Sequence, residues 1–304
     1  MNKPKTTQSK TKLKVAIIGS GNIGTDLLIK VLRSPYLRCG AFVGRNPSSP
    51  GILKAMSLGV PVSVDGIDYI VKHPDCCDIV FDATSAKSHL EHAPFLKKLH
   101  KRVIDMTPAK IGLMSVPSVN LFDCLASFNV NMITCGGQAS IPIAFAIGQT
   151  QSDVDYIEVV SSISSRSAGP ATRQNLDEYI KTTEDGLKKF SGVSQTKAIL
   201  NLNPAEPCVD MQTTIFAKLK KPDLNKLEAY LLPLVNNIKK YVPGYKIILG
   251  PIFDNGRIAV MVRVRGLGDF LPAYAGNLDI INCAAIAMAE EYASTNSKRD
   301  FDGK

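Results

Sequence analysis

Near its N-terminus the chain reads Leu13-Lys-Val-Ala-Ile-Ile-Gly-Ser-Gly-Asn-Ile-Gly24. The β-branched run at residues 13–18 predicts a buried strand, and the apolar spacing over residues 22–33 predicts a helix directly after it. The turn between them carries a G-x-G-x-x-G set at Gly19, Gly21 and Gly24. In this position such glycines let the backbone approach a pyrophosphate. The stretch predicts a dinucleotide-binding βαβ unit, the alternative being a tight glycine turn without a ligand.

Strand and helix patterns alternate through the rest of the N-terminal half. Buried strand patterns recur at residues 40–43, 79–81, 102–105 and 130–134, and a clear helical spacing covers residues 87–99. This alternation predicts an α/β fold with a Rossmann-like, doubly wound parallel sheet.

From about residue 141 the pattern changes to longer strands and two helices. Strands are predicted at residues 156–164, 198–203, 211–219, 245–249 and 258–264, and helices at residues 175–189 and 224–241. This order predicts a C-terminal α+β domain with a mixed sheet. We expect the chain to divide into a basic tail (1–12), a dinucleotide-binding domain (13–135), a second domain (136–276) and a helix (277–293) that completes the first domain.

Composition limits the class of protein. Of 304 residues 45% are hydrophobic, and the formal net charge is +9, with four lysines in the tail. The other basic residues are dispersed, which does not favour nucleic-acid binding, and no apolar run reaches the roughly 18 to 20 residues of a membrane span. Seven cysteines without paired CxxC spacing indicate neither a zinc site nor a disulfide scaffold. We expect a cytoplasmic protein with reduced thiols.

The second predicted strand is followed by residues that bear on the choice of cofactor. No Asp or Glu occurs from residue 27 to residue 64, so the carboxylate that usually holds the adenosine ribose of NAD is missing. Arg45 could contact a 2′-phosphate instead, and Asn46 or Ser48 could contact a hydroxyl. NADP is therefore a possible cofactor beside NAD. The alternative for Arg45 is a solvated turn residue.

Cys135 is the candidate nucleophile. It lies in Asn131-Met-Ile-Thr-Cys-Gly-Gly-Gln138, where a strand is expected to end and a helix to begin. A helix N-terminus favours a thiolate, and the two glycines leave backbone N–H groups for a developing oxyanion. All four histidines precede Cys135, which argues against a Cys–His enzyme. Five other cysteines, at positions 39, 76, 77, 124 and 283, are interpreted as small buried hydrophobes.

A polar loop follows the first strand of the second half. It reads Ser162-Ile-Ser-Ser-Arg-Ser-Ala-Gly-Pro-Ala-Thr-Arg173 and is rich in hydroxyl groups. Two interpretations stay open: a solvated loop, or a loop that reaches the nicotinamide or an anionic acyl acceptor.

Taken together, these stretches resemble the acylating acetaldehyde dehydrogenase family from about residue 12 to residue 292. The resemblance also rests on Phe81-Asp-Ala-Thr-Ser-Ala86, Asp105-Met-Thr-Pro-Ala109, Asn203-Pro-Ala-Glu-Pro207 and Pro272-Ala-Tyr-Ala-Gly-Asn-Leu-Asp279. The family's enzymes depend on coenzyme A and often pair with a 4-hydroxy-2-oxovalerate aldolase in the catabolism of aromatic hydrocarbons. The resemblance implies a Rossmann domain followed by a domain that carries substrate contacts and forms a homodimer.

The resemblance also implies roles for individual residues. Cys135 would form the acyl thioester. Cofactor contacts would come from the glycine turn (Gly19, Ser20, Gly21, Asn22, Ile23, Gly24), from the polar loop (Ser167, Ala168, Gly169, Pro170, Ala171, Thr172, Arg173) and from Asn277. Arg45 is added to these expected cofactor contacts because it follows the second predicted strand, and not because of the resemblance.

Two positions depart from the family pattern. Asn46 replaces an aspartate, which puts strict NAD preference in doubt. Thr213 replaces an aspartate that is a proposed base, and Asp210 is a poor substitute because an odd offset along a strand reverses the face. Turnover is therefore expected to be slow and to rise towards alkaline pH.

The resulting hypothesis is an oxidoreductase that converts a short-chain aldehyde, coenzyme A and NAD(P)⁺ to acyl-CoA and NAD(P)H through a Cys135 thioester. Two alternatives remain: a reductase of the semialdehyde dehydrogenase type, and a non-catalytic dinucleotide sensor or scaffold.

Overall fold

The computed structural model describes residues 12–169, 172–173 and 175–302, so the tail at 1–11 and the positions Pro170 and Ala171 lie outside the described residues. Its N-terminal half is built on a seven-stranded sheet in which every neighbouring pair of strands is parallel. The order is β3-β2-β1-β4-β5-β7-β6. This confirms the predicted Rossmann-like sheet.

The strands of this sheet are β1 (Leu13–Ile18), β2 (Leu37–Val43), β3 (Val62–Ser63), β4 (Ile79–Asp82), β5 (Arg102–Asp105), β6 (Leu113–Met114) and β7 (Asn129–Asn131). The helices between them are α1 (Asn22–Arg33), α2 (Pro50–Ser57), α3 (Ile67–Lys72), α4 (Ala86–Lys98) and α5 (Pro117–Cys124). The strand order reverses between β1 and β4. Ligands of such sheets bind in the crevice outside the carboxyl ends of the strands at this point.

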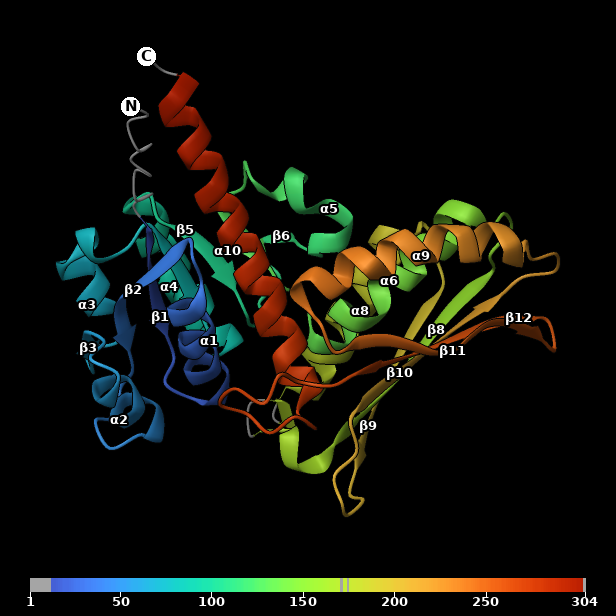
Figure 1. Ribbon diagram of the computed structural model, residues 1–304, viewed down its shortest axis with the longest axis horizontal. Helices are drawn as coiled ribbons and strands as arrows, with labels where there is room; N and C mark the ends of the chain where they lie inside the picture. The colour runs from blue at the N-terminus through green and yellow to red at the C-terminus, as the bar shows by residue number, and fades with distance from the viewer. Residues whose placement is uncertain (1–11, 170–171, 174, 303–304) are drawn as a thin grey trace, which may run out of the picture.

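The C-terminal half is built on a five-stranded mixed sheet of order β11-β12-β10-β8-β9, in which only β8 and β9 are parallel. Its strands are β8 (Tyr156–Ser164), β9 (Thr196–Asn203), β10 (Met211–Lys218), β11 (Tyr245–Asp254) and β12 (Arg257–Val264). Its helices are α6 (Cys135–Thr150), α8 (Leu176–Ser191) and α9 (Leu224–Tyr241). Figure 1 shows these helices over one face of the sheet, with the other face left open.

Two helices join the halves. Helix α6 is apolar around its circumference, and most of its residues are buried, as expected of a helix inside a core. Helix α10 (Gly276–Asp302) runs back from the second sheet and packs against α1, α5 and α6 (Figure 1). It begins one residue before the predicted helix and extends further.

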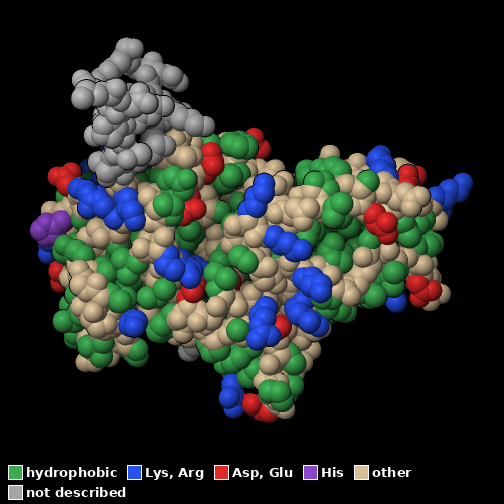
Figure 2. All heavy atoms as spheres, viewed as in Figure 1, with side chains coloured by type: hydrophobic (Ala, Val, Ile, Leu, Met, Phe, Trp, Pro, Cys, Tyr) green, Lys and Arg blue, Asp and Glu red, His purple; other side chains and the backbone are tan. Residues whose placement is uncertain are grey.

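The surface is mixed in character. Figure 2 shows Lys and Arg spread over the viewed face, with Asp, Glu and apolar side chains between them. Among the described residues, no helix is long and apolar enough to cross a membrane.

Candidate active site

Cys135 is the first residue of α6 and follows β7 after a short, strained turn. Ile133 in this turn has a φ of 64°, a left-handed conformation that is rare for a β-branched residue. The Asn131 side chain holds the turn: its Oδ1 accepts the Ile133 N–H at 2.9 Å, and its Nδ2 donates to Asp105 Oδ2 at 2.7 Å. The strand predicted to reach residue 134 therefore ends at Asn131, and the turn places Cys135 at the carboxyl edge of the parallel sheet.

Cys135 lines a cavity of about 680 Å³, counted out to its open mouth. Segments that are distant in sequence form its wall. The lining residues are Ile23, Thr84, Ser85, Ala86, Met106, Thr107, Pro108, Ile133, Thr134, Cys135, Thr172, Asn175, Tyr179, Asn277, Leu278 and Ile281. None of these described residues has a charged side chain. The cavity therefore offers a thiol, hydroxyls and amides in a mostly apolar enclosure.

The electrostatic environment of the thiol differs from expectation. The Cys135 side chain is 9% exposed, and burial raises the pKa of its thiol, although hydrogen bonds from Tyr179 and from the Gly136 N–H oppose the rise. The expectation that the helix N-terminus alone gives thiolate character is therefore wrong here, because desolvation outweighs the terminal N–H groups.

The expectation that the N–H groups of Gly136 and Gly137 are free to bind an oxyanion is also wrong. The Gly137 N–H donates to Thr134 Oγ1 at 2.8 Å, and the Gly136 N–H donates to the Tyr179 hydroxyl at 2.9 Å. A Cβ at Gly136 would lie 2.2 Å from that hydroxyl, so glycine is required there for the approach of Tyr179. Tyr179 was not found from the sequence, because it comes from α8 and only tertiary packing brings it to Cys135.

A second cavity, of about 1030 Å³ when counted out to its open mouth, lies over the glycine turn. Its lining includes the predicted Gly19, Ser20, Gly21, Arg45 and Asn46, together with Thr84, Ser85, Glu91 and His92. Asn22, Gly24 and Ser48 are not in this lining. Gly24 has a packing role, because a Cβ there would lie 1.8 Å from the Gly19 carbonyl oxygen. Thr84 and Ser85 line both cavities, so the two lie next to each other.

Asp82 fixes the loop shared by the two cavities. Its Oδ1 accepts both the backbone N–H and the hydroxyl of Thr84, and its Oδ2 lies 2.9 Å from His89 Nδ1 and 2.8 Å from His92 Nδ1. Burial favours the neutral acid, but these donors hold the pKa of Asp82 well below its usual range. This cluster was not predicted: His89 and His92 were seen only as part of a helical pattern, and Asp82 only as part of a stretch that carries the family resemblance.

His89 also faces a second buried carboxylate. Its Nε2 lies 3.5 Å from Oδ2 of Asp105, the last residue of β5. Burial disfavours the charged ring, but the bond to Asp82 and the charge of Asp105 raise the pKa of His89. Burial also raises the pKa of Asp105 to about 6. Asp105 in turn accepts the Thr107 N–H at 2.7 Å, so the cluster shapes both loops beside Cys135.

Of the residues of the polar loop at 162–173 that the structure describes, only Thr172 lines one of the two cavities. Thr172 lines the Cys135 cavity, whereas Ser167 and Ala168 are buried and are not part of its lining. Arg173 lines neither cavity: its Nε donates to the Ala168 carbonyl at 3.0 Å and its Nη2 to the Ser165 carbonyl at 2.9 Å. Gly169 is likewise absent from both linings. Arg173 therefore shapes its own loop.

Asn277, at the start of α10, is held against this loop. Its Nδ2 donates to the Ser167 carbonyl at 3.4 Å, and its side chain is 1% exposed. In the part of the chain that the structure describes, its Oδ1 has no hydrogen-bond partner.

Thr213 lies behind the nucleophile, outside the cavity lining. It is fully buried in β10, and its Oγ1 is 3.0 Å from Ser161 Oγ. Ser161 in turn lies close to Gly136, because its Oγ would be 3.1 Å from a Cβ at that position. Position 213 is thus separated from Cys135 by one layer of side chains.

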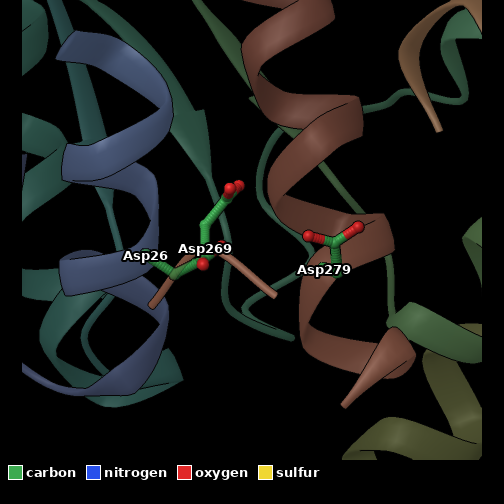
Figure 3. Close-up of side chains that lie close together, drawn as sticks. All are labelled: Asp26, Asp269 and Asp279. Carbon is green, nitrogen blue, oxygen red and sulfur yellow. The ribbon is translucent and has the colours of Figure 1, made fainter. Parts of the chain in front are cut away.

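One acidic cluster lies outside both cavities. Asp26, Asp269 and Asp279 approach one another from α1, from the loop before α10 and from α10 (Figure 3). The Lys30 ammonium lies at 2.7, 3.0 and 2.8 Å from their oxygens, respectively. Burial disfavours the charged amine, but Asp279 and Asp26 outweigh it and raise the pKa of Lys30. The three carboxylates therefore hold an ammonium group in the position that a metal would need.

Comparisons with known proteins agree with this architecture. The family model for prokaryotic acetaldehyde dehydrogenase, dimerisation, matches residues 135–272. An acetaldehyde dehydrogenase of Spirochaeta aurantia is 64% identical over 281 residues, which are 92% of this chain and 95% of that protein. One of Pectobacterium atrosepticum is 56% identical over 290 residues, which are 95% of this chain and 98% of that protein.

A solved structure shows the same fold at low identity. The aspartate semialdehyde dehydrogenase of Candida albicans, determined with NADP, matches this chain with a TM-score of 0.63 at 11% identity. The match covers 92% of this chain and 100% of that chain. At that identity the likeness concerns the fold alone. The identity to the two bacterial enzymes, over nearly the whole of each sequence, confirms the resemblance seen in the sequence. The chain belongs to the prokaryotic acetaldehyde dehydrogenase family and is an oxidoreductase that acts on aldehydes.

Proposed function

We propose that the protein oxidises a short-chain aldehyde with NAD or NADP and transfers the acyl group to coenzyme A through a thioester on Cys135. One observation carries the proposal: the Cys135 sulfur lines an uncharged cavity that shares Thr84 and Ser85 with the cavity over the glycine turn. This arrangement supports the proposal, because Cys135 lies beside a crevice of the kind that binds dinucleotides.

The described residues fit such a cofactor. A Cβ at Gly21 would meet nothing within 4 Å, so the backbone at the start of α1 faces open space, as the approach of a pyrophosphate requires. At the Cys135 end, the buried Asn277 Oδ1 would be satisfied by an amide N–H of a bound ligand. A nicotinamide dinucleotide held by these residues would supply the hydride acceptor.

Cys135 would carry the covalent chemistry. Its thiolate adds to the aldehyde carbonyl, and after oxidation of that carbon the acyl group remains on the sulfur as a thioester. The thiol of coenzyme A then displaces Cys135. The apolar wall supports this sequence, because exclusion of water protects a thioester from hydrolysis.

The lack of charge in the described cavity wall favours an uncharged aldehyde. A semialdehyde that carries a carboxylate would bury its charge there without a basic partner, which is costly. This argues against a reductase of the semialdehyde dehydrogenase type.

The test is a search for both the product and the acyl-enzyme. With acetaldehyde, NAD and coenzyme A the protein should form acetyl-CoA. With coenzyme A omitted, intact-mass spectrometry should find an acetyl adduct on Cys135. Cys135→Ala should lower acetyl-CoA formation by at least about a thousandfold, and Cys135→Ser should also fail, because a hydroxyl without a base is a weak nucleophile.

Two controls make the test specific. Cys124→Ala, which removes a buried thiol outside both cavities, should keep activity. NAD binding by Cys135→Ala should stay near that of the parent. Acetyl-CoA formation by Cys135→Ala would refute the thioester, and dinucleotide binding without turnover of any aldehyde would favour the sensor.

The proposal extends to assembly. We propose a homodimer formed through residues 136–276, with residues 13–135 and the helix at 277–293 binding the dinucleotide; the match to the dimerisation model supports this division. A 4-hydroxy-2-oxovalerate aldolase is the proposed partner in the catabolism of aromatic hydrocarbons. Co-purification of the two proteins tests that partnership.

A further inference from the structure

Tyr179 is the ionisable side chain that lies against the Cys135 sulfur. Its hydroxyl oxygen is 3.5 Å from Cys135 Sγ, and both side chains are buried. Tyr179 comes from α8, which packs on α6 and so belongs to the second half of the molecule. The contact therefore joins Cys135 to a helix of the C-terminal half.

The hydrogen bonds of the hydroxyl determine what it can do. Its oxygen accepts the Gly136 N–H at 2.9 Å, so its own O–H is left to donate. Thr134 is another polar side chain beside it. Thr134 Oγ1 accepts the Gly137 N–H at 2.8 Å and donates to Thr183 Oγ1 at 2.7 Å, because the Thr183 hydroxyl itself donates to the Tyr179 carbonyl at 2.8 Å. The Cys135 sulfur, 3.5 Å from the Tyr179 oxygen, is the acceptor in hydrogen-bond contact with this hydroxyl among the described side chains. Burial raises the pKa of Tyr179 well above its usual value, so the hydroxyl keeps its proton.

The surroundings offer no competing charge. The residues that line the cavity come from α1, from the loops after β4 and β5, from the turn before α6 and from α10, together with Thr172, Asn175 and Tyr179. Among the described members of this set, Tyr179 and Cys135 are the titratable groups, and none is cationic. A thiolate here is stabilised by hydrogen bonds alone.

We propose that Tyr179 is a catalytic residue whose O–H donates a hydrogen bond to the Cys135 thiolate, a task that a histidine performs in Cys–His enzymes. This rests on the proposed function. The thiol proton leaves to hydroxide from solvent, and Tyr179 keeps its own proton throughout. The same hydrogen bond acts again when coenzyme A attacks the thioester: the bond between Cys135 sulfur and acyl carbon breaks, and the electron pair returns to the sulfur as thiolate.

The experiment measures the alkylation of Cys135 by iodoacetamide as a function of pH, read on the Cys135 peptide by mass spectrometry. Tyr179→Phe should slow this alkylation at about pH 8 by at least about tenfold and move the profile to higher pH, because a hydrogen bond to a charged group is lost. Tyr245→Phe is the matched control: Tyr245 is also buried and also bonds to α6, through the Ala139 carbonyl at 2.8 Å, but it does not touch Cys135. Its profile should match that of the parent.

A second measurement tests the same hydrogen bond and does not require that the Tyr179→Phe variant folds. Replacement of all tyrosines by fluorotyrosine makes each phenol a stronger donor without loss of the hydroxyl, and it should move the Cys135 profile to lower pH. Tyr179→Phe should also lower kcat for acetyl-CoA formation by at least about tenfold.

The outcomes separate the two proposals. An alkylation profile unchanged in Tyr179→Phe, or unmoved by fluorotyrosine, would overturn the role of Tyr179 even if the protein makes acetyl-CoA. The predicted shifts without acetyl-CoA formation by the parent would leave the hydrogen bond established and the proposed function refuted.

Discussion

Cys76 and Cys135 differ in what surrounds their sulfur atoms. A hydrogen bond from Cys77 lowers the pKa of Cys76 to about 7 against a smaller effect of burial, and Lys101 and Lys14 add to the lowering. Cys76 is only partly buried. Cys135 is enclosed, and burial raises its pKa. Of these two thiols, the one with more thiolate at neutral pH is therefore not the proposed nucleophile.

This contrast predicts the order of labelling. At about pH 7 in the absence of ligands, iodoacetamide should modify Cys76 at least about tenfold faster than Cys135, because the thiolate is the reactive form. The difference should shrink as the pH rises, since Cys76 is then already ionised while Cys135 continues to ionise. Peptide mapping by mass spectrometry checks this, with Cys76→Ser as the control that leaves the Cys135 rate unchanged. Faster labelling of Cys135 at neutral pH would contradict the prediction.

Arg45 and Asn46 border the cavity over the glycine turn, where a ribose carboxylate is missing. The parent should therefore accept NADP measurably beside NAD. Arg45→Ala should lower kcat/KM for NADP by about tenfold and affect NAD less, and Asn46→Asp should favour NAD by repelling a 2′-phosphate. Arg38→Ala, which removes an exposed arginine outside this lining, is the control. Strict use of NAD together with an unchanged Arg45→Ala variant would make Arg45 a surface residue.

At the scale of elements, Lys30 links three segments of the chain through ion pairs. Its ammonium group binds carboxylates of α1, of the loop before α10 and of α10 itself. Asn282 of α10 adds a hydrogen bond to Asp26 at 2.8 Å. The two helices that this cluster joins also supply Ile23 and Asn277 to the Cys135 cavity. The cluster therefore holds the C-terminal helix in the position that closes the site.

Removal of the central ammonium group should be costly. Lys30→Met leaves the buried Asp26 and Asp279 without their cation, whereas the partly buried Asp269 keeps its pair with Arg33. The change should lower the free energy of unfolding by about 3–5 kcal/mol, measured by urea titration at neutral pH. The deficit should shrink as the pH falls, because protonation relieves the repulsion between the carboxylates. Lys181→Met, which breaks an exposed pair with Asp185, should have little effect. An equal loss of unfolding free energy in both variants would show that the buried cluster contributes no more than an exposed ion pair.

At the scale of the whole molecule, the open face of the five-stranded sheet is the surface available for dimerisation. One row of this face crosses all five strands through neighbouring residues of the ladder: Ile199, Val160, Thr214, Met261 and Leu249. Four of the five are apolar, and Ile199 and Leu249 are exposed. A nearly apolar row on an uncovered sheet face is typical of a protein interface.

A charge placed in this row should prevent assembly. Val160→Lys should shift the protein from dimer to monomer in analytical ultracentrifugation, because the lysine would be buried without a partner. Leu232→Lys is the control, since Leu232 is an exposed apolar residue on α9, away from the open face. Dissociation by Leu232→Lys with an intact Val160→Lys dimer would place the interface on the helical side.

The longer elements could be predicted because their periodicity is strong. The helices at residues 22–33 and 224–241 were predicted with the bounds that the structure shows. The strands β3 and β6 were missed, because two residues carry no readable alternation. The end of β7 was misplaced, since the left-handed Ile133 is held by the Asn131 side chain, which is itself fixed by the distant Asp105.

By itself the sequence determined the parallel sheet, the glycine turn and a cysteine at the start of a buried helix, because each depends on residues that are neighbours along the chain. Tertiary structure decided the chemistry around that cysteine. Tyr179 reaches Cys135 across 44 positions, and Asp269 reaches Lys30 across 239. Such contacts arise when separate elements bury their apolar faces together, and local spacing carries no record of which polar groups then meet. For the same reason burial, which raises the thiol pKa, could be known only from the packed cavity.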